Sequence, residues 1–292
     1  MNNKKAAVYI LLGQSNAVGH GIPMEEKDII NTPLKNVFGL HRDPNQSFDT
    51  DKLVWSNYTS YGMNLAEEQD NTYSVVNCLA QNWQNHIDSG NKENLPDLYI
   101  IQIAIGAQAV TPGYMWYPKM ERKLIPGKLG TVNISLYSFA CHIFSLLDKS
   151  FKEIGKEYEI IGLHWRGGSN DITEETSYLK ENLFNIYCEI FDGFNKILNY
   201  PPTVLHLLFI KERCFDCDST GKYYENMLHI DEVFEKLAEK YSNVSLFDVR
   251  KAPQYIEGVR CNGIYIEDAV HFTPEVNNWV STEIMREYIE RA

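Results

Sequence analysis

Five strand-like runs alternate with helical patterns along this chain, and that alternation limits the possible folds more than any other feature of the sequence. The runs are rich in β-branched and apolar residues and cover residues 6–12, 98–105, 158–165, 203–210 and 244–249. The helical patterns cover residues 74–88, 135–154, 177–199, 230–241 and 274–291, the last with Thr273 as its cap and Pro274 at its first position. Strands that alternate with helices pair in parallel and are covered on both faces. We therefore predict a parallel five-stranded sheet between two layers of helices.

Two long stretches, residues 20–72 and 107–133, contain Gly, Pro, Asn and aromatic residues but little periodicity. Each follows the end of a predicted strand, and open α/β sheets bind ligands outside the carboxyl ends of their strands. Long loops in compact domains are usually functional, so we expect these two to build a substrate pocket. No linker rich in Pro, Gly or Ser divides the chain, which predicts one domain over residues 1–292.

The charge balance bears on possible partners and location. The chain has 27 basic and 39 acidic residues, a formal net charge of −12, which opposes binding to nucleic acid and anionic membranes. No stretch approaches the roughly 20 apolar residues that cross a bilayer. The opening MNNKK lacks the apolar core of a signal peptide. We predict a cytoplasmic protein without nucleic-acid or membrane partners, or a secreted one if a leader has been removed; the oligomeric state stays open.

Six cysteines are too few for a disulfide scaffold in a chain of 292 residues. Cys214 and Cys217 form one C-x-x-C pair, which is half of a zinc site, a redox pair or simply two loop thiols. No second pair accompanies it. We favour loop thiols and predict neither a metal nor another cofactor.

The first strand ends in the motif Gly13-Gln14-Ser15-Asn16. A serine in this place is either a helix cap or a nucleophile, and a nucleophile needs a base and an acceptor that fixes the base's tautomer. Asp268 and His271 supply such a pair near the end of the chain, although D-x-x-H also occurs in metal sites and surface turns. The G-x-S-x-G motif of α/β-hydrolases is absent because residue 17 is alanine. A serine hydrolase would therefore need a different scaffold.

Four short blocks together resemble the SGNH hydrolase superfamily. They are GQSN after the first strand, IAIGA after a middle strand, GGSND after the next and DAVH near the end, and they span residues 13 to 271 in the family's order. GQSN in place of GDSL is similar to the sialate O-acetylesterase-like branch, carbohydrate esterase family 6. The resemblance implies a three-layer α/β/α sandwich with a flavodoxin-like parallel five-stranded sheet.

The same resemblance implies roles for five residues. Ser15 matches the nucleophile, His271 the general base and Asp268 the carboxylate that orients the base. The backbone N–H groups of Ser15 and Gly106 and the side-chain amide of Asn170 match an oxyanion hole, a set of donors that stabilises the charge of an acyl-transfer intermediate. Taken singly, Gly106 also fits a tight turn and Asn170 an Asx-turn.

The third block departs from the branch, which usually reads W-x-Q-G-E there, whereas residues 165–171 read WRGGSND. The branch glutamine and glutamate are missing from this block, which contains Arg166 after its tryptophan. The permanent cation of Arg166 could pair with a substrate carboxylate or with Asp171. We favour the internal pair with Asp171, which leaves sialic acid as a guess for the substrate.

Several further residues are candidates for substrate binding or for packing. Gln14 and Asn16 are expected to brace the turn and the pocket through amide hydrogen bonds. Tyr114, Trp116 and Tyr117 either form a stacking face for a sugar or pack their own loop. His20 and His164 have no acidic neighbour spaced like Asp268, so we expect core or surface roles for them.

These residues together predict a serine esterase. It would remove short acyl groups, above all acetyl, from carbohydrate hydroxyls through an acyl-enzyme. One alternative is a lipase- or arylesterase-like hydrolase of non-sugar esters, which a longer apolar pocket would indicate. Another is a glycan-binding protein on the same fold that has lost turnover, although such a protein has no reason to keep Ser15, Asp268 and His271.

Overall fold

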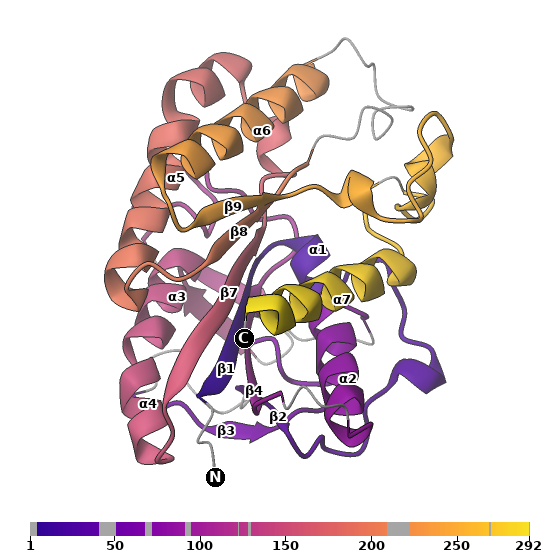
Figure 1. Ribbon diagram of the computed structural model, residues 1–292. Coiled ribbons are helices and arrows are strands. Elements are labelled where there is room, and N and C mark those ends of the chain that lie inside the picture. The colour runs from indigo at the N-terminus through magenta and orange to yellow at the C-terminus, as the bar shows by residue number, and fades with distance from the viewer. Residues whose placement is uncertain are drawn as a thin grey trace.

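The computed structural model describes residues 5–40, 51–67, 72–90, 95–121, 123–127, 130–208, 222–268 and 270–291. Its centre is a seven-stranded sheet (Figure 1). The strands are β1 (Ala6–Gly13), β2 (Val37–Leu40), β3 (Trp55–Asn57), β4 (Leu98–Ala104), β7 (Tyr158–Arg166), β8 (Thr203–His206) and β9 (Val244–Phe247). Their order is β3-β2-β4-β1-β7-β8-β9, and every neighbouring pair is parallel except β2 and β3.

The five predicted strands are all present and lie side by side as β4-β1-β7-β8-β9. The first strand is therefore flanked by the second and third, which is the flavodoxin-like order. The predicted number of strands is wrong, because β2 and β3 extend one edge of the sheet. Both lie in the stretch 20–72, and at four and three residues they are too short to show a period.

Seven α-helices surround the described part of the sheet. They are α1 (Ser15–Val18), α2 (Val75–Asp88), α3 (Leu136–Ser145), α4 (Leu147–Glu153), α5 (Thr176–Leu198), α6 (Lys222–Lys240) and α7 (Pro274–Arg291). The pattern at 135–154 is two helices that meet at Leu146, and α6 begins eight residues before its prediction at residue 230. Thr273 caps α7 as predicted, since its hydroxyl accepts the N–H of Val276 at 3.4 Å.

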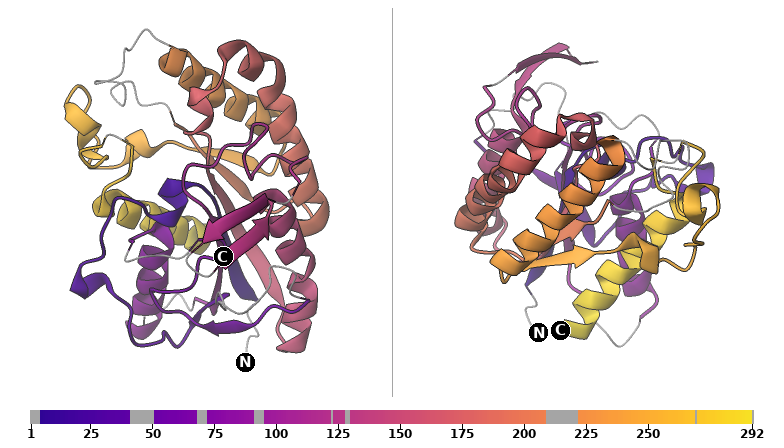
Figure 2. Two further views of the ribbon diagram at one scale, coloured as in Figure 1. Left: turned by 180° about the vertical axis from the view of Figure 1, so that it is seen from behind. Right: turned by 90° about the horizontal axis from the view of Figure 1, so that it is seen from above.

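The side chains of β1 alternate between two hydrophobic cores. Residues Ala6, Val8, Ile10 and Leu12 pack with α3, α4, α5 and α6, whereas Ala7, Tyr9 and Leu11 pack with α2 and α7. A strand buried on both faces explains why its sequence is apolar throughout. The two further views show the same two helix layers with the sheet between them (Figure 2). The predicted three-layer α/β/α sandwich is confirmed.

The stretch 107–133 is also not a pure loop. Strands β5 (Lys123–Gly127) and β6 (Gly130–Ile134) pair there as an antiparallel hairpin. Short 3-10 helices are η1 (Glu26–Asp28), η2 (Asp171–Thr173), η4 (Val249–Lys251) and η5 (Arg260–Gly263). Among the described helices, none combines the length and apolar character needed to span a membrane.

Candidate active site

Ser15 lies where the central strand β1 turns directly into helix α1. Gly13 makes this turn with φ at 144°, and a Cβ there would collide with the backbone carbonyl of Arg166 on the neighbouring strand. The N–H groups of Ala17 and Val18 then donate to the carbonyl of Gln14 at 2.7 and 3.0 Å, which closes the first turn of the helix. Ser15 is 8% exposed, at the carboxyl end of the sheet.

Asp268 and His271 form the hydrogen bond that their spacing suggests, with 2.6 Å between Asp268 Oδ2 and His271 Nδ1. The other carboxylate oxygen accepts the backbone N–H groups of Val270 and His271 at 2.8 and 2.9 Å. Partial burial favours the neutral carboxyl, but the hydrogen bonds from His271 and Val270 outweigh it and lower the pKa of Asp268. The carboxylate is thus charged and fixes the imidazole through Nδ1.

The side chain of Asn16 joins the serine turn to the histidine loop. Its Nδ2 donates to the carbonyl of Val270 at 3.0 Å, and its Oδ1 accepts the N–H of Phe272 at 3.2 Å. These two hydrogen bonds, here called the Asn16 bridge, flank His271 on both sides and start from the residue next to Ser15. The fold therefore brings together two segments that lie more than 250 residues apart in the sequence.

Two reacting atoms are left without partners by this arrangement. Among the described residues, the Ser15 hydroxyl makes no hydrogen bond, and the buried His271 Nε2 also has none. The hydrogen bond between nucleophile and base that a serine hydrolase uses is therefore not formed in this conformation. Such contacts are often loose before substrate binds.

Gly106 follows β4, and its backbone N–H is already occupied. The N–H donates to Glu67 Oε2 at 2.7 Å, while Glu67 Oε1 lies 3.0 Å from His20 Nε2. The His20 ring lies against Gly106 so closely that a Cβ at residue 106 would overlap it. The same ring is 6.3 Å from the ring of His271. Glu67 thus occupies a donor that the sequence assigns to an oxyanion.

Asn170 is held close to this donor. Its Nδ2 donates to the carbonyl of Ala107 at 3.0 Å, and its N–H donates to Gln14 Oε1 at 3.3 Å. Gln14 also donates through Nε2 to the hydroxyl of Ser169. Ala107 has φ at 55°, a conformation that alanine rarely adopts and that is often found at functional sites. The amide of Asn170 has two hydrogens, so one stays available for a ligand.

The predicted ion pair between Arg166 and Asp171 is wrong. Trp165 faces the core with α5, so strand alternation turns Arg166 to the opposite face, toward α7. Asp171 is fully buried and accepts the N–H of Val110 at 3.0 Å. Burial raises the pKa of its carboxyl to about 7. Arg166 therefore has a different environment, described below.

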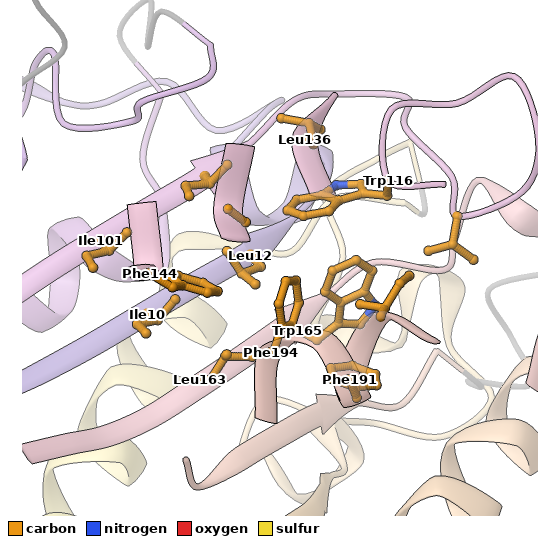
Figure 3. Close-up of a cluster of buried hydrophobic side chains, with 14 of the residues drawn as sticks. Ile10, Leu12, Ile101, Trp116, Leu136, Phe144, Leu163, Trp165, Phe191 and Phe194 are labelled. Atoms are coloured by element: carbon orange, nitrogen blue, oxygen red, sulfur yellow. The ribbon is translucent and has the colours of Figure 1, made fainter. Parts of the chain in front are cut away.

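Trp116 is a core residue, so its predicted role in binding a sugar is wrong. The side chain is 1% exposed, its Nε1 donates to the carbonyl of Gly13 at 2.9 Å, and its ring meets Trp165 edge-on at 4.9 Å. Figure 3 shows the two indoles together in the cluster between the sheet and the helices. Tyr114 and Tyr117 on the same loop are half-buried.

His20 and Glu67 are the site residues that sequence reasoning missed. The one sequence signal for His20 was its position five residues after Ser15. Its acidic neighbour, Glu67, comes from a loop far along the chain. His164 has the expected core position and hydrogen-bonds His206 at 3.0 Å. Cys214 and Cys217 lie outside the described residues. Within the described part, no group of three or more His, Cys, Asp or Glu side chains could hold a metal ion.

Comparisons with known proteins support the fold. Neither a protein-family model nor a curated protein sequence matches the chain. A crystal structure of NanS superposes with a TM-score of 0.59 at 14% identity, over 100% of this chain and 98% of that one. A protein of Arabidopsis thaliana gives 0.56 at 14% identity, over 98% and 99%. The chain therefore shares its fold with these two proteins along nearly its whole length.

Proposed function

We propose that this protein is a serine esterase that removes short acyl groups, above all acetyl, from carbohydrate hydroxyls. One observation carries the proposal: the Asn16 bridge ties the loop of the Asp268–His271 pair to the residue that follows Ser15, and His271 Nε2 has no partner among the described residues. A neutral imidazole oriented through Nδ1 presents Nε2 as a proton acceptor.

The reaction follows from these positions. Ser15 Oγ attacks the ester carbonyl as its proton passes to His271 Nε2, and Asp268 stabilises the resulting imidazolium. The alcohol then leaves with that proton, and water, deprotonated by the same imidazole, releases the acid from the acyl-enzyme. The oxyanion would accept from the N–H of Ser15, the N–H of Gly106 and the amide of Asn170. Glu67 must leave the N–H of Gly106 before that N–H can serve.

The preference for a small acyl group rests on the polarity of the surrounding side chains. Asn16 adjoins Ser15 and contacts the loop of His271, and the His20 ring, which contacts Glu67, lies 6.3 Å from the His271 ring; an acyl tunnel would need an apolar wall there instead. The GQSN block and the fold shared with NanS support an acetylesterase in the same way.

A fluorophosphonate probe tests the proposal. We expect one covalent adduct per chain, located on Ser15 by peptide mass spectrometry, together with hydrolysis of p-nitrophenyl acetate. Ser15→Ala should keep the wild-type circular dichroism spectrum and lose both signals. An unlabelled, inactive wild-type protein would favour the glycan-binding alternative, and turnover by the Ser15→Ala variant would remove Ser15 as nucleophile.

A chain-length series tests the acyl group. Acetyl esters should exceed octanoyl esters in kcat/KM, and acetylated sugars should exceed simple alkyl acetates. In an apolar channel each buried CH2 would instead add about 0.8 kcal/mol. A steady rise in kcat/KM from acetyl through butyryl to octanoyl p-nitrophenyl esters would therefore favour the lipase- or arylesterase-like alternative.

A further inference from the structure

Arg166 is a buried cation that lacks an acidic partner in the described part of the chain. The residue is 3% exposed, and its Nη1 donates to the carbonyl of Asn16 at 3.1 Å and to Asn277 Oδ1 at 2.9 Å. Its guanidinium carbon lies 4.8 Å from the centre of the Phe272 ring. Nε and Nη2 are buried and have no hydrogen-bond partner among the residues that the structure describes. A buried charge with unused donors is costly, so this side chain is suited to an anion that the chain does not supply.

The unused atoms have the geometry of a binding fork. Nε and Nη2 lie on one edge of the planar guanidinium, and their two parallel N–H groups match the two oxygens of a carboxylate. Burial lowers the pKa of Arg166 to about 10, which still leaves it charged near neutral pH. One cation balances one negative charge, so a carboxylate suits the site better than a doubly charged phosphate.

Arg166 also lines a small cleft. Its lining includes Asn16, Arg166, Ser169, His206, Tyr265 and Phe272. His206 is 3% exposed and hydrogen-bonds His164 through Nε2, while its Nδ1 has no partner in the described part of the chain. Burial lowers the pKa of His206 well below its ordinary value, so the ring is neutral. A second unused polar group therefore belongs to the same cleft.

The cleft adjoins each segment of the candidate active site. Asn16 follows Ser15, Ser169 precedes Asn170, and Phe272 follows His271. A ligand group bound at Arg166 would thus sit beside the place where the ester carbonyl is attacked. The rest of the chain, with its net charge of −12, offers an anion little attraction, so this local cation would decide where one binds.

We propose that this cleft is a carboxylate-binding subsite in which Nε and Nη2 of Arg166 hold the two carboxylate oxygens and His206 lines the wall. The carboxylate comes either from the ester substrate itself or from a free acid such as the acetate that hydrolysis would release. The first source rests on the proposed function and makes the substrate an acylated sugar acid, whereas binding itself needs no turnover.

Binding is tested on the full chain by thermal unfolding, with sodium acetate or sodium glucuronate compared with sodium chloride at equal ionic strength. A carboxylate that binds the folded state should raise the wild-type Tm in a saturable way. Arg166→Lys removes the fork but keeps the charge, and Leu207→Trp fills the cleft from a half-buried position; both should lose the shift. Arg286→Lys on the exposed face of α7 should retain it. No shift with either acid in the wild type, or a shift retained in Leu207→Trp, would overturn the subsite.

A matched pair of substrates separates the two sources. Mono-O-acetyl glucuronate and mono-O-acetyl glucose differ only in the carboxylate, and we expect a kcat/KM ratio of about ten in the wild type and near one in Leu207→Trp. A Tm shift without that ratio assigns the subsite to a free acid and overturns the substrate assignment. A Tm shift in a protein that hydrolyses no ester would instead overturn the proposed function and leave the subsite standing.

Discussion

The two sides of the candidate site are built differently. On the nucleophile side, the Asn16 bridge and the Asp268–His271 hydrogen bond hold the groups together and leave the Ser15 hydroxyl and His271 Nε2 without partners among the described residues. On the oxyanion side, Glu67 occupies the N–H of Gly106.

This difference separates the groups that already have the arrangement needed for the reaction from the group that must change its hydrogen-bond partner. Donors that face the reacting atoms in advance cost no reorganisation during the reaction. On the nucleophile side the Asp268–His271 hydrogen bond is already formed, and only the bond between His271 and Ser15 is still to be made. The oxyanion side must exchange an internal acceptor for the substrate oxygen, so weakening the bond between Glu67 and the Gly106 N–H should raise activity, whereas loss of a bond on the nucleophile side should lower it.

The largest effect is expected from Asp268→Asn. The asparagine oxygen can still accept the two backbone N–H groups, but its NH2 would donate to His271 Nδ1 and place the imidazole proton on Nε2. The wrong tautomer costs roughly 10⁴ in kcat in a serine protease. Initial rates with p-nitrophenyl acetate measure this loss. Asp248→Asn is the matched control, because Asp248 also accepts a backbone N–H, that of Arg250, and has no contact with Asp268 or His271 among the described residues. Equal rates in both variants would contradict the role of Asp268.

On the oxyanion side, Asn170→Ala should lower kcat by roughly 10² to 10³ with little change in KM, as removal of one oxyanion donor does. Steady-state kinetics on the same ester gives both constants. Asn182→Ala provides the control, because that amide likewise donates to a backbone carbonyl, on α5. If Asn170→Ala keeps the wild-type kcat, Asn170 is a turn residue and not an oxyanion donor.

Breaking the Asn16 bridge tests whether it positions the histidine loop. Asn16→Ala should lower kcat about 10- to 10²-fold, the scale of a small misplacement of reacting groups. Asn16→Asp keeps an acceptor for the Phe272 N–H but loses the donor to Val270, so it should fall between alanine and wild type. If both variants keep the wild-type kcat, the bridge does not position the base.

Glu67→Gln should raise activity, whereas each of the preceding variants of the site should lower it. A neutral amide holds the Gly106 N–H more weakly than a carboxylate does, by about 1 kcal/mol, so kcat/KM should rise about five-fold. Glu283→Gln, at an exposed ion pair on α7, should leave the rate unchanged. A fall in kcat/KM for Glu67→Gln would show that the carboxylate assists the reaction.

Asp171→Asn should hardly change the rate, because Asn can still accept the Val110 N–H, but it should change how stability depends on pH. The folded-state pKa is raised from 3.8 to about 7, so wild-type stability is highest in acid and falls as pH rises through about 7. Denaturant unfolding at pH 5 and pH 8 should show a wild-type loss of about 2 kcal/mol. The variant should lack that loss; parallel curves would mean that Asp171 is not buried.

The sheet could be predicted because each of its main strands is buried on both faces and therefore apolar along its length. The edge strands β2 and β3 could not, because three or four residues carry no period. The helices could be predicted from the periodicity of their apolar faces. Their ends could be predicted less exactly, because a helix end carries no such period. Within the site, Ser15, Asp268 and His271 could be named because their chemistry needs these residue types.

The sequence by itself determined the five main strands and the layered fold that their alternation with helices predicts, because periodicity is a local property, and residue type singled out Ser15, Asp268 and His271 as candidates. Only the tertiary structure decided that Asn16 ties the histidine loop to Ser15 and that Glu67 occupies the Gly106 N–H. It also decided that Trp116 is a core residue and that Arg166 has no acidic partner among the described residues. Each of these contacts depends on the face to which a side chain points and on the distant loop that it meets. Local sequence spacing does not encode these two properties.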